Sequence, residues 1–209
     1  MKLIFDKVLS LVGLLIFIPI LLVVALKIKS EDGGPVFYRG ERVGLHKKKF
    51  YMLKFRTMVM NAEKIGGPTT SLNDPRITRI GHFIRKFKID ELPQLINVIK
   101  GDMSLVGPRP EVVSEVRVYD SKWDVIFSIR PGITDLSSIE FSNEGEIIAK
   151  SGIADSHEAY RLLIQPKKLK LQKHYAMNQS FLLDLKILWQ TFLAVIKKNR
   201  ILKIKRSRK

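Results

Sequence analysis

The chain contains no cysteine and only four histidines among its 209 residues. Without cysteine there is neither a disulfide framework nor a thiolate zinc site, and the scattered histidines include no close pair with zinc-ligand spacing. The glycine fingerprints of dinucleotide-binding and P-loop proteins are absent as well. Dehydrogenases and P-loop nucleotidases are therefore excluded.

Acidic residues are scarce: 20 Asp and Glu face 37 Lys and Arg, so the formal net charge is +17. This excess indicates a polyanionic partner, which could be nucleic acid, an anionic membrane surface or a phosphorylated substrate. The sequence has no helix-turn-helix spacing, zinc pattern or aromatic ribonucleoprotein motif. We therefore expect no nucleic-acid partner.

Charge is missing altogether from residues 8–26, VLSLVGLLIFIPILLVVAL. As a helix this run would measure about 28 Å, close to the thickness of the hydrocarbon core of a bilayer. A cleaved signal peptide fits less well, because the run is longer than an ordinary apolar signal region and no small-x-small cleavage site follows it. The run therefore indicates a membrane segment.

The topology of this segment is open between a spanning helix and a re-entrant one. Two lysines lie on each side of it, namely Lys2 and Lys7 before it and Lys27 and Lys29 after it. The charge asymmetry that orients a spanning helix is thus missing. Pro19 lies at the middle, where it removes a backbone hydrogen bond and favours a bend. We predict a re-entrant membrane helix over residues 1–29 with its break at Pro19.

Asp90 and Glu91 form an adjacent acidic pair ahead of a predicted helix whose apolar stripe is Leu92, Leu95, Ile96 and Ile99. An acid at a helix N-terminus is commonly only a cap, because its carboxylate accepts free backbone N–H groups. The same position also suits a phosphate. The pair alone does not decide between a cap and a site.

Three cations strengthen the interpretation as a site. Lys54 lies near the end of a predicted strand, Arg85 lies off the apolar stripe of a predicted helix over 77–87, and Arg109 is held between two prolines. Their side chains could make charge-assisted contacts to phosphate. A hard dication such as Mg²⁺ would take oxygens from a carboxylate and from a substrate phosphate. These residues predict phosphoryl-group chemistry at a membrane surface.

Four motifs behind the apolar segment resemble the bacterial sugar transferases known as small monotopic phosphoglycosyl transferases: KFRTM (54–58), DPRITRIGHFIRK (74–86), IDELPQLINVIKGDMSLVGPRP (89–110) and RPGIT (130–134). The resemblance covers essentially the whole chain. We expect a helix-rich α/β protein with a small cytosolic catalytic domain over 30–180. An interfacial amphipathic helix and a basic membrane-surface tail should follow over 181–209.

The resemblance also implies the chemistry. Asp90 would be the nucleophile, Glu91 would be catalytic and hold Mg²⁺, and Lys54, Arg85 and Arg109 would contact phosphate. Asp90 would attack a uridine nucleotide sugar, and the phosphosugar would then pass to polyprenyl phosphate. The protein would lie on an anionic membrane, the bacterial inner membrane, with its catalytic domain facing the cytoplasm, and would initiate surface glycan synthesis.

Two positions depart from the family pattern. Ile18 precedes Pro19 where family members often have Ser, and Asp135 follows RPGIT where many have Gly. The second difference predicts a nucleotide or sugar loop of a different kind. The alternative to the enzyme is a membrane-tethered nucleic-acid-binding or scaffold protein without catalysis, which leaves the acidic pair without a purpose. The sequence does not choose the sugar, the glycan pathway or the oligomeric state.

Overall fold

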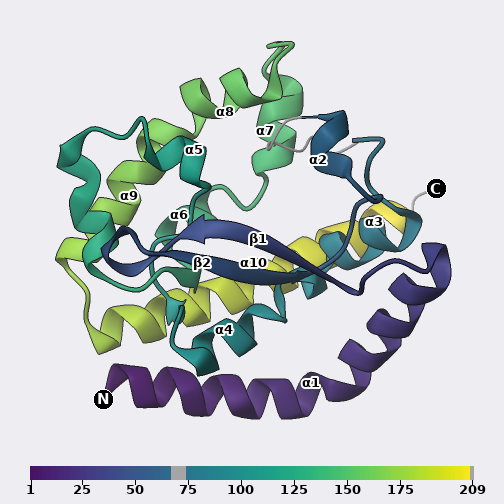
Figure 1. Ribbon diagram of the computed structural model, residues 1–209, viewed down its shortest axis with the longest axis horizontal. Helices are drawn as coiled ribbons and strands as arrows, with labels where there is room; N and C mark the ends of the chain where they lie inside the picture. The colour runs from purple at the N-terminus through teal and green to yellow at the C-terminus, as the bar shows by residue number, and fades with distance from the viewer. Residues whose placement is uncertain (67–73, 208–209) are drawn as a thin grey trace.

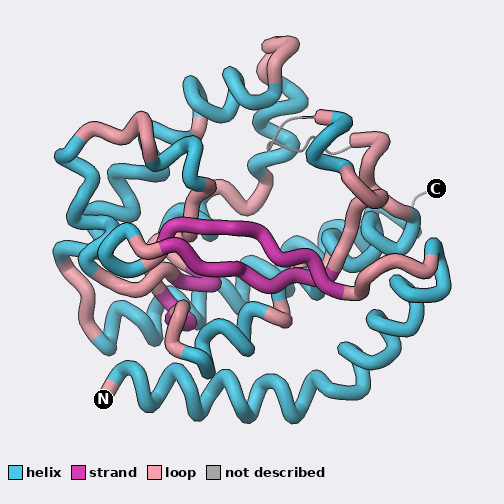
Figure 2. Tube along the Cα trace, viewed as in Figure 1, coloured by secondary structure: helices cyan, strands magenta, loops and turns pink. Residues whose placement is uncertain are grey.

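The computed structural model describes residues 1–66 and 74–207, without the side chains of Glu63 and of residues 197–209. The side chains of the predicted basic tail therefore lie outside the described part. Helices make up most of the described chain and the strands are short (Figure 2), so the prediction of a helix-rich α/β fold is confirmed. In chain order the elements are α1 (Lys2–Asp32), β1 (Phe37–Val43), η1 (Leu45–Lys47), β2 (Lys49–Phe55), α2 (Ala62–Ile65), α3 (Arg79–Lys86), η2 (Ile89–Glu91), α4 (Gln94–Lys100), β3 (Ser104–Val106), α5 (Val113–Val116), η3 (Ser121–Ser128), β4 (Gly132–Thr134), α6 (Leu136–Glu140), α7 (Glu144–Lys150), α8 (Ser156–Leu163), α9 (Gln165–Met177) and α10 (Phe181–Ser207).

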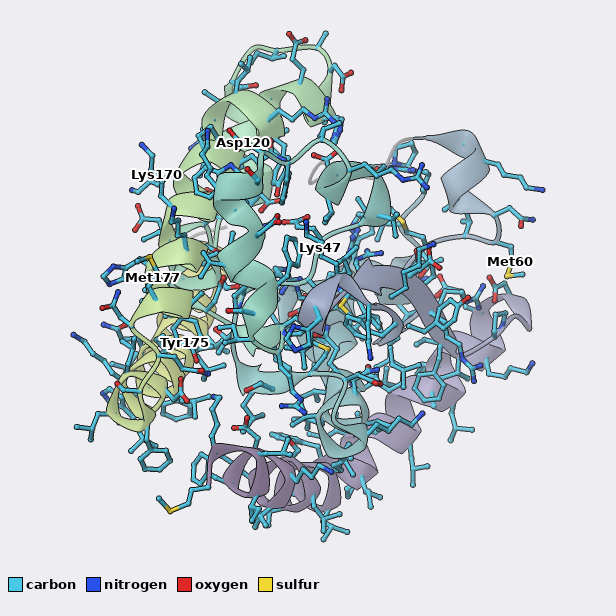
Figure 3. All side chains as sticks on the ribbon, turned by 60° about the vertical axis from the view of Figure 1, so that its left-hand side comes forward. Lys47, Met60, Asp120, Lys170, Tyr175 and Met177 are labelled. Carbon is cyan, nitrogen blue, oxygen red and sulfur yellow. The ribbon has the colours of Figure 1, made fainter. Side chains whose placement is uncertain are left out.

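The apolar N-terminal segment forms one long helix, α1, which includes Pro19 and ends where Gly33 adopts a left-handed conformation. Figure 1 shows that α1 passes alongside α4 and then bends. The bend is consistent with the backbone hydrogen bond that proline cannot make. α1 is long and apolar enough to cross a membrane, and only 11% of its most apolar window is buried. Most of its side chains project away from the rest of the chain, as Figure 3 shows.

The antiparallel hairpin of β1 and β2 lies between two parts of the hydrophobic core. Its register runs from the pair Phe37 and Phe55 to the pair Val43 and Lys49. Because side chains alternate along a strand, Met52 faces the core under α4 and α10, whereas Phe55 faces the core formed with α1 and α3. Lys54 shares the face of Met52, which directs it toward α4.

The sequence did not predict the parallel pair of strands formed by β3 and β4. Each strand has three residues and is largely buried, so neither shows the alternation that marks a half-exposed strand. The strands meet through Gly107 and Gly132, where a Cβ added to Gly132 would lie 2.1 Å from the Gly107 nitrogen. This close approach places the loop after β3 beside the loop before β4.

The last two helices close the core. Tyr175 of α9 is fully buried and donates its hydroxyl hydrogen to the Val106 carbonyl oxygen, at 3.1 Å, while also contacting Asp184 of α10 (Figure 3). Ile187 of α10 is buried in the same core. Large apolar side chains of α10 also remain exposed, namely Phe181, Leu182, Leu185, Trp189, Phe192, Leu193, Val195 and Ile196. Because Asp184 is buried while these apolar side chains are exposed, the predicted amphipathic helix at the membrane interface stays a prediction.

One local prediction was wrong. The sequence places Lys54 and Arg56 near the end of a predicted strand, where both side chains would lie on one face, but β2 ends at Phe55. Arg56 lies beyond the strand and donates from Nη1 to Asp32 at the end of α1, at 2.6 Å. Of the two cations, only Lys54 therefore remains a candidate for contact with phosphate.

Candidate active site

The acidic pair lies in η2, one turn ahead of α4, and not in the first turn of α4 itself. Lys88 enters this turn with a left-handed conformation, and Pro93 occupies the N-cap position of α4. No side chain caps α4, so the interpretation of Asp90 as an ordinary helix cap is excluded. Asp90 is only 7% exposed, which makes its charge costly unless something compensates it.

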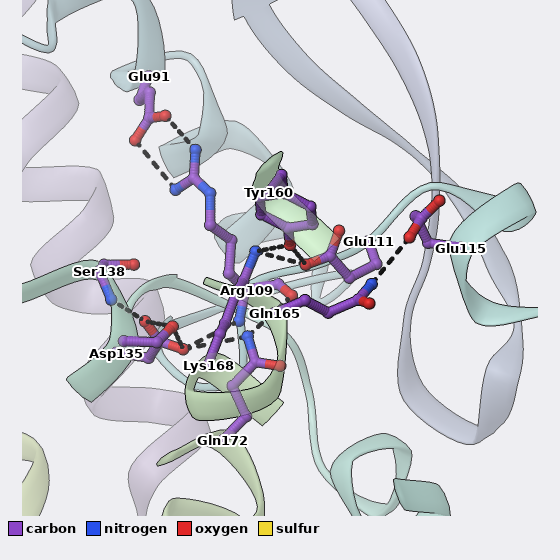
Figure 4. Close-up of polar contacts among 11 residues, drawn as sticks. Glu91, Arg109, Glu111, Glu115, Asp135, Ser138, Tyr160, Gln165, Lys168 and Gln172 are labelled. Carbon is purple, nitrogen blue, oxygen red and sulfur yellow. Dashed lines mark hydrogen bonds and ion pairs between the residues drawn. The ribbon is translucent and has the colours of Figure 1, made fainter. Parts of the chain in front are cut away.

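Glu91 is held by two cations. Lys54 Nζ donates to Glu91 Oε1 at 3.0 Å, and Arg109 reaches both carboxylate oxygens, from Nη2 to Oε1 and from Nη1 to Oε2 (Figure 4). Burial by itself raises the pKa of Glu91, but the charges of Arg109 and Lys54 outweigh it and hold the pKa well below its usual range. The charge of Glu91 in turn raises the pKa of Arg109. Glu91 is therefore a fixed anion at the centre of the site.

Asp90 has the opposite environment. Its Oδ1 is buried and accepts no hydrogen bond from any described residue. Burial, followed by the neighbouring charge of Glu91, raises the pKa of Asp90 above its usual range, against the smaller opposing effects of nearby cations. The two adjacent acids therefore differ: two cationic side chains donate to Glu91, whereas no described residue donates to Asp90.

Arg85 lies beside the pair without bonding to it. Two side chains cap the N-terminus of its helix, α3. Thr78 Oγ1 accepts from the Gly81 nitrogen at 3.0 Å, and Glu31 of α1 accepts from the Arg79 nitrogen at 2.8 Å. Burial lowers the pKa of Arg85, while Asp90 is the charge that opposes this most strongly. α3 therefore presents a desolvated guanidinium near Asp90.

Asp135 and Gln172, which the sequence interpretation did not place in the site, support Arg109. Asp135 caps α6 by accepting from the Ser138 nitrogen at 2.6 Å, and it also accepts from Gln172 Nε2 at 3.2 Å (Figure 4). The Arg109 nitrogen donates to Asp135 Oδ2 at 3.4 Å, a long bond. Because Asp135 is fully buried, it does not form an open sugar loop. The Asp-x-x-Ser capping pattern was its only sequence signal.

The structure thus brings Lys54, Glu91 and Arg109 into direct contact and places Asp90 and Arg85 beside them. Pro19 lies apart from this group, within α1. The described residues include no cluster of three or more side chains that could ligate a metal. Adjacent carboxylates with an unbonded oxygen nevertheless fit a hard dication whose other ligands are phosphate oxygens and water.

Comparison with known proteins identifies the family of this chain. The model of the family described as "Bacterial sugar transferase" matches residues 1–198. The exopolysaccharide production protein ExoY of Sinorhizobium fredii is 36% identical over 206 residues, covering 91% of this chain and 83% of that protein. The UDP-galactose-lipid carrier transferase of Erwinia amylovora is 37% identical over 212 residues, covering 93% of this chain and 41% of that protein.

The name of a third relative includes both a sugar donor and an acceptor. The UDP-N-acetylgalactosamine-undecaprenyl-phosphate N-acetylgalactosaminephosphotransferase of Aeromonas hydrophila is 34% identical over 196 residues, covering 91% of this chain and 42% of that protein. The chain spans less than half the length of this relative and of the Erwinia protein. The family match itself covers nearly the whole chain. The chain therefore belongs to the bacterial sugar transferase family and, as its motifs predicted, is a phosphoglycosyl transferase.

Proposed function

We propose that this enzyme transfers a sugar 1-phosphate from a UDP-sugar to polyprenyl phosphate through a covalent aspartyl-phosphosugar intermediate, and so initiates bacterial surface glycan synthesis. The observation that carries the proposal is the contrast between two adjacent acids: Glu91 is bound by two cations, whereas the buried Asp90 is bound by none in the described part of the chain. A carboxylate without a hydrogen-bond partner keeps its lone pairs available for attack. The reactions named for the relatives support the same donor and acceptor classes.

Two displacements at phosphorus complete the reaction. In the first, an oxygen of Asp90 bonds to the phosphorus that carries the sugar, the bond from this phosphorus to the bridging oxygen breaks, and the nucleoside monophosphate leaves. In the second, an oxygen of polyprenyl phosphate attacks the same phosphorus and Asp90 leaves as a free carboxylate. Splitting one transfer into two steps is the usual benefit of a covalent nucleophile.

The cations provide the electrostatic part of the reaction. An anionic carboxylate and an anionic phosphate repel each other, and positive groups fixed around the phosphate remove that barrier. In our proposal Arg85 meets the attacked phosphate beside Asp90. Lys54 and Arg109 hold Glu91 in place and direct their remaining N–H groups to phosphate oxygens.

Mg²⁺ is the cofactor that this donor set fits. Glu91 Oε2 has only a 3.4 Å contact with Arg109 Nη1, so it keeps capacity for a metal, and the buried Asp90 Oδ1 lies on the adjacent residue. A bound ion would polarise the phosphoryl oxygens of the substrate. Glu91 would hold it, together with the substrate and water.

Release of nucleoside monophosphate tests the proposed function. Purified enzyme, polyprenyl phosphate and Mg²⁺ should release uridine monophosphate from at least one member of a panel of UDP-sugars. Guanosine diphosphate sugars serve as controls and should release none. Chelation with EDTA should stop release, and added Mg²⁺ should restore it. An enzyme that releases no monophosphate from any UDP-sugar in the panel would contradict the proposal.

The contacts of α1 support the re-entrant topology, which we also propose. At its start, Lys2 pairs with Asp184 at 2.5 Å, and Asp6 accepts from the Ser104 hydroxyl at 2.5 Å. At its end, Asp32 and Glu31 bond to Arg56 and to the first turn of α3. Both ends of α1 therefore contact the same globular part, which a straight transmembrane crossing would not allow. The exposed apolar side chains of α10 would lie at the same membrane surface, the cytoplasmic face of the bacterial inner membrane.

Thiol labelling in intact cells tests this topology, because the native chain contains no cysteine. A cysteine inserted after Met1 should be protected from an impermeant external reagent. Pro19→Ala restores a backbone N–H and favours a straight helix of about the bilayer thickness, so it should increase external labelling. A cysteine at exposed Ser114 should stay protected in both backgrounds. Strong external labelling of the inserted cysteine with Pro19 intact would establish a spanning helix.

A further inference from the structure

Arg42 of β1 lies on the same face of the hairpin as Lys54. Tyr38 pairs with Lys54 in the strand register, and Arg42 follows four residues later on the same face. Gly40 separates them, and a Cβ added there would lie 2.8 Å from Tyr38 Cε1 and 2.9 Å from Arg42 Nη1. The absence of a side chain at Gly40 therefore allows the guanidinium of Arg42 to fold back over the strand toward the Tyr38 ring.

The charge of Arg42 has no carboxylate partner. In the described part of the chain no acid lies within ion-pair distance of it, and its Nη1 donates to its neighbour's backbone, the Glu41 carbonyl oxygen, at 2.8 Å. The nearest acid in the adjacent loop, Glu111, is already bound by Lys168 at 2.5 Å and by the Tyr160 hydroxyl at 3.1 Å (Figure 4). Burial lowers the pKa of Arg42. A desolvated guanidinium with donors to spare is suited to an anionic ligand.

Arg42 lies at the end of β1, next to the segment that carries Arg109. The Val43 nitrogen donates to the Glu111 carbonyl oxygen at 3.0 Å, which fastens the end of β1 to the segment that carries Arg109. The charge of Arg109 is among those that act on Arg42, whereas Arg85 responds most strongly to Asp90. Arg42 and Arg85 therefore adjoin different parts of the site, Arg42 near Arg109 and Arg85 near the nucleophile.

The balance of charge leaves room for two phosphates. Five cations, namely Arg42, Lys54, Arg85, Lys88 and Arg109, accompany the two acids Asp90 and Glu91. A diphosphate would neutralise part of this excess of positive charge. In an in-line displacement the leaving oxygen lies opposite the nucleophile, so the phosphate that departs lies on the side away from Asp90.

We propose that Arg42, with Arg109, binds the phosphate on the nucleoside side of the nucleotide sugar and retains it in the released nucleoside monophosphate. This inference rests on the proposed function and assigns the leaving phosphate a place beside Arg42. In the second displacement Asp90 is the leaving group, so the acceptor oxygen must attack from the side opposite Asp90. The phosphate of polyprenyl phosphate therefore enters the same place after the monophosphate has left, and Arg42 acts on both displacements.

Separated half-reactions test this subsite in the purified full-length enzyme. Arg42→Gln should raise KM for the UDP-sugar and Kd for uridine monophosphate by about tenfold or more, equivalent to about 1.4 kcal/mol. Transfer from the preformed adduct to polyprenyl phosphate should slow as well, because the acceptor phosphate enters the place that the monophosphate has left. Gly40→Ala keeps every charge but displaces Arg42, so it should raise the same two constants by a smaller factor. Arg39→Gln, on the opposite face of β1 and exposed, is the matched control and should change neither.

The outcomes distinguish the inference from the function on which it rests. Unchanged monophosphate binding in a folded Arg42→Gln variant would overturn the inference, even if the enzyme were active. An equal effect of Arg39→Gln would also overturn it, because only diffuse charge would then matter. A wild-type enzyme that binds uridine monophosphate through Arg42 but transfers no sugar phosphate would refute the proposed function and leave the subsite standing.

Discussion

Replacing Asp90 with Asn is expected to abolish both the covalent adduct and turnover. An amide is a poor nucleophile, so the rate should fall by about 10⁴-fold or more, as it does when other covalent enzymes lose their nucleophile. The fold should persist, because Asp90 accepts no hydrogen bond from the described residues and the amide has the same shape. Intact-protein mass spectrometry after incubation with a UDP-sugar and Mg²⁺, without lipid acceptor, should show the added sugar phosphate only in the wild-type enzyme.

Asp124→Asn is the matched control for this prediction. Asp124 is a half-exposed surface acid that pairs with Lys47 at 2.7 Å, away from the acidic pair. The same change of charge there should leave adduct formation and turnover intact. A fully active Asp90→Asn enzyme would require a different nucleophile and would remove the aspartyl intermediate from the mechanism.

Arg109→Lys is expected to be nearly as damaging as Arg109→Ala. The guanidinium reaches both oxygens of Glu91, and a lysine ammonium can keep the charge but not this forked geometry. We expect kcat/KM to fall by about 10²–10³-fold in both variants, the usual range for the loss of a donor that stabilises a transition state. The thermal unfolding midpoint should also fall, because Glu91 would be left as a buried charge with one cation.

Steady-state kinetics and thermal unfolding of the two variants measure these effects. Arg117→Lys, at an exposed position at the end of α5, is the control and should behave as the wild type does. Wild-type kinetics in Arg109→Lys would mean that this site needs positive charge without a bidentate donor. In that case Glu91 would not depend on the fork that Figure 4 shows.

The local elements that show a clear period were predictable. The stripes of α3 and α4 repeat with the spacing of a helix, and α1 is marked by one long uncharged run. A strand was also expected near Lys54, where β2 lies. The parallel pair of β3 and β4 was not predictable in this way. Three buried residues carry no alternation, and the pairing depends on the approach of Gly107 to Gly132, which are 25 positions apart by number.

The same distinction applies to the site. The long motif around Asp90 and Glu91, with Lys54, Arg85 and Arg109, was enough to predict the family and to choose candidate residues for the site. It could not show that both cations bind Glu91 while no described residue bonds to Asp90, because hydrogen-bond assignment depends on distances across the fold. Gln172 and Arg42 were missed for the same reason, and Asp135 was expected in a substrate loop, whereas it caps α6.

The sequence by itself determined the class of this protein, since a basic chain with an apolar anchor and one long acidic motif fits few chemistries. Only the tertiary structure decided which acid is free. Burial raises the pKa of Asp90 and cations lower that of Glu91, and both influences arise from groups brought together by the fold. The position of Arg42 beside Arg109 likewise depends on the fastening of β1 to the loop after β3. The family therefore followed from the order of motifs along the chain. The different environments of Asp90 and Glu91 followed from contacts between segments that are distant in the sequence.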